Sequence, residues 1–156
     1  MTQSTQWHLV QLNVAYSVAP LDSPQLADFV ALLPEINALA DRSPGFVWRL
    51  TDDTGTDATS LRPFGPDTIV NLSVWESLDR LRDYAYRSAH LAVLQRRREW
   101  FKPHGRPYQV LWWLEVGRLP TVAEAAQRLE MLDERGPTPE AFTFRAVFPE
   151  PGTLAA

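Results

Sequence analysis

The sequence has 156 residues, of which 45% are hydrophobic and 22% are charged, and both fractions are close to those of ordinary globular domains. This length and balance exclude a disordered chain, a collagen-like fibre and a coiled coil. The formal net charge of −4 argues against a nucleic-acid partner, because proteins that bind nucleic acids usually carry a basic surface. The local basic run Arg96-Arg97-Arg98 is interpreted as a solvent-exposed helix face.

The sequence contains no cysteine, so disulfide bonds, thiolate catalysis and zinc–thiolate sites are excluded. Residues 1–6 are polar and lack the apolar stretch of a signal peptide. No apolar run approaches the roughly 18–20 residues that a membrane-spanning helix needs. We therefore expect a cytoplasmic protein with no membrane partner, folded as a single domain over residues 1–156.

Hydrophobic periodicity predicts a strand, a helix, two strands, a second helix and a fourth strand, in that order. The strands are expected over residues 6–15, 46–50, 68–75 and 108–116. The first helix is expected to begin at Ser23-Pro24 and to be kinked or split at Pro34. The second is predicted as one long helix over residues 78–100. This β-α-β-β-α-β order is typical of the ferredoxin-like fold, an α+β fold with helices on one face of an antiparallel sheet.

A C-terminal extension, residues 118–156, follows this ferredoxin-like unit of about residues 6–117. Thr121 and Glu124 have the spacing of a capping box, which marks the start of a helix, and Gly136 is a typical helix stop. Residues 142–148 alternate loosely and are expected to form an extended arm. Two roles are open for this extension, which are to cover a ligand pocket or to extend a contact between subunits.

The predicted sheet has two chemically different faces, because successive side chains of a strand point to opposite sides. The aliphatic face carries Val10, Leu12, Val14, Val70, Leu72, Val74, Val110, Trp112 and Leu114. The mixed face carries Leu9, Gln11, Asn13, Ile69, Asn71, Ser73, Trp75, Gln109, Leu111, Trp113 and Glu115. Neither face has the composition of a solvent-exposed face, and the helices of a ferredoxin-like unit cover only one. We therefore expect a second copy of the chain to cover the other face, which gives a homodimer.

Two interpretations of the mixed face remain open. Its amides and hydroxyls either hydrogen-bond to one another as structural groups, or they line a pocket for a small apolar or aromatic ligand. Ligand pockets combine mostly apolar walls with a few convergent polar groups. On the second interpretation, Trp75 and Trp113 form the wall, and Asn13 and Ser73 are among the substrate-binding residues.

Several segments resemble a known superfamily. The motif Asn71-x-x-x-Trp75, followed by Glu76 and a helix with Tyr84-Ala85-Tyr86-Arg87-Ser88-Ala89-His90, is similar to the antibiotic-biosynthesis-type monooxygenases of the dimeric α+β barrel superfamily. Over nearly its full length the chain resembles a bacterial family of that superfamily, a domain of unknown function. The segments that carry the second resemblance are Gln11-Leu12-Asn13, Ser43-Pro44-Gly45-Phe46-Val47-Trp48-Arg49-Leu50, Val70-Asn71-Leu72-Ser73-Val74-Trp75-Glu76, Tyr86-Arg87-Ser88-Ala89-His90, Arg97-Arg98-Glu99-Trp100-Phe101 and Gly136-Pro137-Thr138-Pro139-Glu140-Ala141-Phe142-Thr143-Phe144. This resemblance implies a dimeric α+β barrel.

The monooxygenase resemblance also implies roles for individual residues. In the quinone-forming members, an asparagine and a tryptophan on this strand bind the substrate phenol and help to activate oxygen without metal or flavin. By position, these are Asn71 and Trp75, and the histidine of the same pattern is His90. Tyr84 and Arg87 are the candidates for the further aromatic and arginine partners of those enzymes.

Three interpretations of His90 follow. It is a hydrogen-bonded structural residue, or a general base, since an imidazole titrates near neutral pH. The third is an axial haem ligand, because other dimeric α+β barrels hold haem through a helix histidine. The sequence has no carboxylate–histidine spacing suited to non-haem iron and no glycine-rich phosphate loop. We therefore expect no metal and no cofactor, with haem as the alternative.

Three functional hypotheses result. The first is an enzyme that acts on an aromatic or polyketide-like molecule by cofactor-independent oxygenation, or by a related isomerisation or cyclisation, with Asn71, Trp75 and His90 as catalytic residues. The second is a non-catalytic dimer that binds an apolar ligand. The third is a haem protein.

Overall fold

The computed structural model describes residues 6–52, 61–65, 68–87, 90–103 and 105–152. The segment between the second and third predicted strands therefore lies partly outside the described residues, as do Ser88, Ala89 and His104. The elements are β1 (Trp7–Tyr16), α1 (Ala27–Arg42), β2 (Phe46–Arg49), β3 (Thr68–Trp75), α2 (Leu78–Arg87), α3 (His90–Gln95), α4 (Arg97–Trp100), β4 (Gln109–Glu115) and α5 (Val122–Arg135). No helix among the described residues is long and apolar enough to cross a bilayer.

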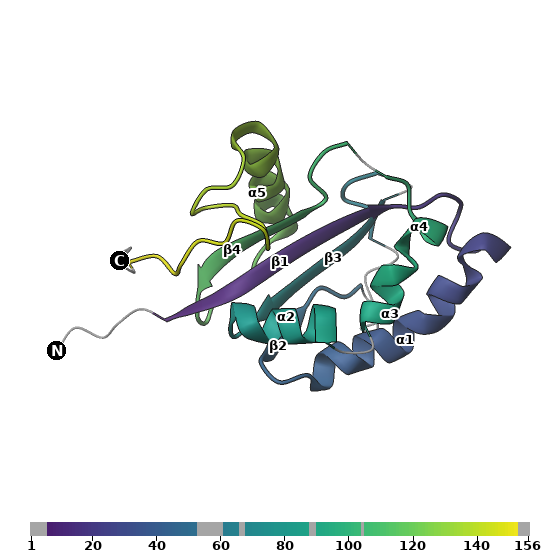
Figure 1. Cartoon of the computed structure of the whole chain (residues 1–156), viewed down its shortest axis with the longest axis horizontal. Coiled ribbons are helices and arrows are strands. Elements are labelled where there is room, and N and C mark those ends of the chain that lie inside the picture. The colour runs from purple at the N-terminus through teal and green to yellow at the C-terminus, as the bar shows by residue number, and fades with distance from the viewer. Residues whose placement is uncertain (1–5, 53–60, 66–67, 88–89, 104, 153–156) are drawn as a thin grey trace.

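The strands form one antiparallel sheet in the order β2-β3-β1-β4 (Figure 1). The first and third strands are therefore the central pair, which is the ferredoxin-like arrangement, and the predicted α+β fold is confirmed. Within the central pair, Gln11 lies opposite Ser73 and Asn13 lies opposite Asn71. Helices α1 to α4 lie on one side of this sheet and α5 lies on the other, beside β4 (Figure 1).

The start of α1 and its proline differ from the prediction. A short 3₁₀ turn begins at Pro24, but the Ser23 hydroxyl makes no cap and donates to the Pro20 carbonyl at 2.5 Å. Pro34 lies inside α1 without splitting it. The proline lacks the N–H that would bond to the carbonyl of Val30. The helix nevertheless continues past Pro34 to Arg42.

The prediction of one uninterrupted helix over residues 78–100 is wrong, because the described residues leave the helix after Gln95 and re-enter it at Arg97. Arg96 breaks the helical conformation between α3 and α4, with φ −95° and ψ 4°. After this break Trp100 is buried and its ring lies 5.4 Å from that of Phe29 on α1. Periodicity does not register such a break, because apolar residues on both sides of it still face the sheet.

The aliphatic face is buried within a single copy of the chain. Its strand residues are 0–5% exposed, and Ala125 and Leu132 of α5 pack against them. The Thr121 hydroxyl caps α5 by accepting from the Glu124 N–H at 3.0 Å, and Gly136 ends it with φ 72°, so the predicted C-terminal helix is confirmed. The argument that this face needs a second copy of the chain is therefore wrong, since α5 and apolar residues such as Leu61 and Phe64 of the same chain pack against it.

The C-terminal arm packs along the outer edge of β4. Leu111 and Phe142 exchange two backbone hydrogen bonds of 2.8 and 2.9 Å. The Phe142 side chain is fully buried, and Phe144 and Phe148 pack with it against the end of the mixed face that carries Trp75. The arm thus contributes aromatic side chains to the same side of the sheet as α1 and α2.

Candidate functional site

A cavity of about 220 Å³ lies between the mixed face of the sheet and helices α1, α2 and α3. Residues far apart in the sequence line it together, and six of the eight predicted site residues are among them. These are Asn13, Asn71, Ser73, Trp75, Tyr84 and His90. Asn71 is exposed although it lies on a central strand, so the cavity is open to solvent at this point.

The two other predicted site residues, Arg87 and Trp113, do not line the cavity. The Arg87 side chain is 80% exposed and pairs with Asp83, four residues earlier, on the outer side of α2. Trp113 lies on the mixed face as expected, but its indole N–H donates to the carbonyl of Phe148 at 3.0 Å, so the arm covers it. The order of strands and helices does not predict that Arg87 faces away from the cavity, nor that the arm passes over Trp113.

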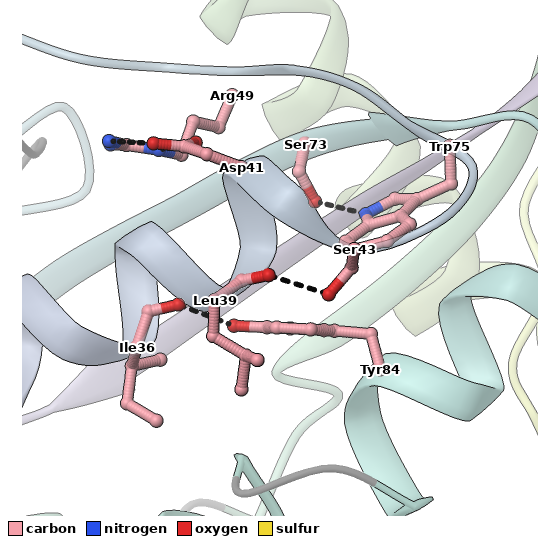
Figure 2. A network of polar contacts seen from close by, with 8 residues as sticks. All are labelled: Ile36, Leu39, Asp41, Ser43, Arg49, Ser73, Trp75 and Tyr84. Atoms are coloured by element: carbon pink, nitrogen blue, oxygen red, sulfur yellow. Dashed lines mark hydrogen bonds and ion pairs between the residues drawn. The ribbon is translucent and has the colours of Figure 1, made fainter.

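A hydrogen-bonded chain runs across the floor of the cavity from β1 to β3. The Gln11 amide nitrogen donates to the side-chain oxygen of Asn71 and, at 2.9 Å, to the Ser73 hydroxyl. The Trp75 indole N–H donates to the same hydroxyl at 2.9 Å (Figure 2). The Gln11 nitrogen also lies 3.4 Å from the Asn71 backbone carbonyl, which can only accept, and this supports the orientation of the amide.

This chain determines which atoms remain available to a ligand. The Ser73 oxygen already accepts two hydrogen bonds, so its own O–H is left to donate. The side-chain oxygen of Asn71 is occupied by Gln11, so its NH₂ group is the half that can bond to a ligand. The two interpretations of the mixed face are therefore compatible with each other, because these groups bond to one another and also line the cavity. Gln11, which is 6% exposed, was missing from the predicted site.

A series of aromatic rings in edge-to-face or tilted contact crosses from β2 to α3 along one wall of the cavity. The ring of Trp75 lies 5.4 Å from that of Phe46 and 5.0 Å from that of Tyr84. The ring of Tyr84 lies 4.8 Å from that of His90. Aromatic rings at such distances stabilise one another beyond the area that they bury. The series connects His90 on α3 to Trp75 on β3 through Tyr84 on α2.

Tyr84 ties α2 to α1. Its hydroxyl donates to the carbonyl of Ile36 at 3.3 Å (Figure 2). Burial raises the pKa of Tyr84 well above its usual value, the positive charge of Arg49 lowers it, and the negative charge of Asp41 raises it. The phenol therefore stays protonated at neutral pH and acts as a hydrogen-bond donor.

His90 is neutral at pH 7, and two influences on its pKa act in opposite directions. Burial lowers the pKa of His90 from 6.5, and a hydrogen bond to the Ala85 carbonyl partly raises it. The Nδ1 atom lies 3.2 Å from this carbonyl, which can only accept, so the proton of the neutral ring is on Nδ1. The lone pair of the imidazole is then on Nε2, which is the protonation state that a general base requires.

The predicted solvent-exposed face formed by the arginine run of α4 holds for only part of that run. Arg96 pairs with Glu99 and Asp28, and Arg98 is exposed. Arg97 instead lines the cavity, donating to the Tyr108 hydroxyl at 2.6 Å, with its guanidinium carbon 4.2 Å from the centre of that ring. Only the turn between α3 and α4 directs the middle arginine inward, and the sequence carries no signal for it.

Arg49 is a second arginine that lines the cavity. It lies on β2, opposite Ser73, and its side chain is 16% exposed. Asp41, in the last turn of α1, accepts two hydrogen bonds from it at 2.8 and 3.2 Å. The charge of Arg49 is therefore balanced by a neighbouring carboxylate. None of the described residues that line the cavity is an aspartate or glutamate.

For the haem alternative, the predicted axial ligand His90 has its Nδ1 on the Ala85 carbonyl and its ring against Tyr84, so only Nε2 is placed to bind a haem iron. Within the described part of the chain, no group of three or more histidine, aspartate or glutamate side chains is placed to hold a metal ion.

Two solved structures resemble this fold. One is a protein of unknown function from Nitrosomonas europaea, with 15% identity and a TM-score of 0.47, covering 76% of this chain and 99% of the other. The second is a mutant of SnoaB, a cofactor-independent oxygenase from Streptomyces nogalater, with 15% identity and a TM-score of 0.44, covering 72% of this chain and 95% of the other. No curated protein matches the sequence.

A family model described as a domain of unknown function, DUF3291, matches residues 8–156. The match begins in β1 and continues through α5 and the arm, so it includes every described residue that lines the cavity. It confirms the resemblance to a domain of unknown function that the sequence motifs indicate. This chain therefore belongs to the DUF3291 family.

Proposed function

We propose that this protein is an enzyme that acts on an aromatic or polyketide-like molecule in the cavity beneath α1, α2 and α3. The reaction is a cofactor-independent oxygenation, or an isomerisation or cyclisation that begins with the same proton transfer. One observation carries the proposal: Asn71 and Trp75 on β3 and His90 on α3 line one cavity, although they come from separate elements. These are also the residues for which the monooxygenase resemblance implies roles.

Each residue has a defined part in the proposed reaction. The Asn71 NH₂ group donates to the oxygen of the substrate, and Trp75 supplies a flat apolar wall. Nε2 of His90 accepts a proton from a phenol or an activated C–H, because the neutral ring has its lone pair there. In the oxygenation, dioxygen oxidises a ring CH₂ to a carbonyl, and its second oxygen atom leaves as water with the two hydrogens.

The test is oxygen consumption and product analysis with a panel of anthrones and quinols. Wild type is expected to turn over at least one of them, and the Asn71→Ala/His90→Ala double variant is expected to lose this turnover. His8→Gln is a matched control, since His8 lies on β1 and does not line the cavity. If wild type is no faster than the double variant on every compound, the catalytic proposal is wrong.

The second candidate is a binding protein without catalysis. The observation that favours it is the chain from Gln11 to Trp75, in which several polar groups of the floor already bond to one another. A binding protein would be stabilised thermally by its ligand without changing it. Recovery of a converted product by mass spectrometry would contradict this candidate.

A homodimer is also part of the proposal, since the chain resembles dimeric α+β barrels. Native mass spectrometry of the purified protein measures this directly, together with any retained small molecule. A monomer mass alone at micromolar concentration would contradict the dimer and would leave the assignment of the cavity unaffected.

A further inference from the structure

One charged group that lines the cavity, the Arg97 guanidinium, has no carboxylate partner among the described residues. Arg97 forms no ion pair with any described residue, whereas Arg96 and Arg49 both do. Its guanidinium instead contacts the Tyr108 phenol, which is uncharged when protonated. A partly buried guanidinium without a carboxylate is a typical place for an anionic ligand, because a charged group out of water needs a charged partner.

The neighbouring phenol adds a second donor at the same position. Tyr108 accepts a hydrogen bond from Arg97, so its own O–H can donate to another group. The ring also holds the guanidinium 4.2 Å from its centre, which restricts its motion. A planar guanidinium beside a hydroxyl matches a carboxylate, which accepts parallel hydrogen bonds through two oxygens.

The floor of the cavity has the same bias toward donors. The Gln11 chain leaves the Asn71 NH₂ and the Ser73 O–H to face a ligand, and the described lining contains no carboxylate that would repel an anion. The cavity therefore presents donors at two places, the floor on β3 and the Arg97–Tyr108 pair.

We propose that the ligand of this cavity is an aromatic carboxylic acid whose carboxylate is bound by Arg97 and Tyr108. A ring oxygen of the same molecule then lies against Asn71 and Ser73, where the proposed reaction takes place. The position of the ring oxygen at Asn71 and Ser73 rests on the proposed function. The carboxylate site at Arg97 and Tyr108 does not, because it requires only that the ligand binds.

The experiment measures the binding of matched acid and amide pairs by calorimetry: benzoate, 1-naphthoate, 2-naphthoate and 1-hydroxy-2-naphthoate, each against its neutral carboxamide. These one- and two-ring compounds are small enough to probe the carboxylate site without depending on the full extent of the cavity. At least one acid is expected to bind about tenfold or more tightly than its amide, the size of a charge-assisted hydrogen bond.

Variants locate the preference on the protein. Arg97→Gln is expected to abolish the difference between acid and amide, and Tyr108→Phe to reduce it. Arg98→Gln, the exposed neighbour on the same helix, is expected to keep it. Circular dichroism checks that each variant is folded, and Tyr108→Phe provides the test if Arg97→Gln is not.

Three outcomes would overturn the inference: no acid in the series binds better than its amide, Arg97→Gln keeps the preference, or Arg98→Gln loses it. The outcomes also separate the two proposals. If the protein prefers acids through Arg97 but turns over no substrate, the carboxylate site is supported and the catalytic proposal is wrong. If it turns over neutral substrates but shows no preference for acids, the catalytic proposal is supported and the carboxylate site is wrong.

Discussion

The two faces of the sheet are made by alternate residues of the same strands, yet they are packed in opposite ways. On the aliphatic face, α5 leaves the strand residues 0–5% exposed. On the mixed face, α1, α2 and α3 stand over a cavity of about 220 Å³ with amides, hydroxyls and an imidazole in its walls. One face fills its space with side chains, and the other leaves room for a ligand.

The aliphatic face therefore contributes mainly to stability, and the mixed face is where a ligand can bind. Close packing of apolar side chains supplies most of the stability of a domain, whereas a cavity lined by polar groups costs stability unless a ligand fills it. Adjacent residues of β1 allow a direct comparison, since Leu12 points to the aliphatic face and Gln11 to the mixed face. Substitutions on the two faces test this division.

The largest expected effect is on catalysis at the mixed face. His90→Gln removes the proposed base and is expected to lower turnover by about 10²–10⁴-fold, the usual contribution of general base catalysis. Wild-type turnover is also expected to fall as the pH drops through the pKa of His90, which burial places below 6.5. A pH–rate profile of both proteins tests this, and an unchanged profile in His90→Gln would assign the base to another residue.

The next effect is on stability at the aliphatic face. Leu12 is fully buried, and Leu12→Ala is expected to lower the free energy of unfolding by about 2–5 kcal/mol, because it removes apolar contacts and leaves a void. Chemical denaturation measures this loss. A decrease of less than about 1 kcal/mol would mean that α5 can close the void and that the face is not tightly packed.

A smaller loss is expected for the neighbouring Gln11→Leu. It leaves the side-chain oxygen of Asn71 without the amide that donates to it, while Ser73 still accepts from Trp75. The expected loss in the free energy of unfolding is about 1–3 kcal/mol. The control Gln127→Leu, at an exposed position of α5, should change it by about 0.5 kcal/mol or less. If Gln11→Leu instead raises the free energy of unfolding, apolar contacts at this position stabilise the protein more than the hydrogen bonds of Gln11 do.

The smallest effect concerns the linkage between protonation and folding at His90. The unfolded imidazole has a pKa near 6.5, and burial lowers the pKa in the folded protein. The unfolded chain therefore binds more protons at mildly acidic pH, and the stability of wild type should decrease as the pH falls through 6.5. Denaturation of wild type and His90→Gln at about pH 7.5 and about pH 5.5 isolates this contribution. A decrease of equal size in both proteins would contradict it.

Much of the fold could be predicted because its signals are local. The strand boundaries agree within a residue or so, and Thr121, Glu124 and Gly136 mark α5 as expected. The break between α3 and α4 could not be predicted, since no glycine or proline marks it in the sequence. The packing of α5 against the aliphatic face was also missed, because the sequence does not show which face of the sheet a C-terminal helix contacts.

For the candidate site, the separation of an aliphatic face from a mixed face could be predicted from the order of residues along each strand. This alternation places Asn13, Asn71, Ser73 and Trp75 together, because side-chain direction in a strand follows from position alone. The groups from distant parts of the chain that contact this face became known only from the folded structure. Gln11 bonds to β3, His90 stacks on Tyr84, and Arg97 turns toward Tyr108. These contacts depend on how helices and loops pack across the sheet, which no short stretch of sequence encodes.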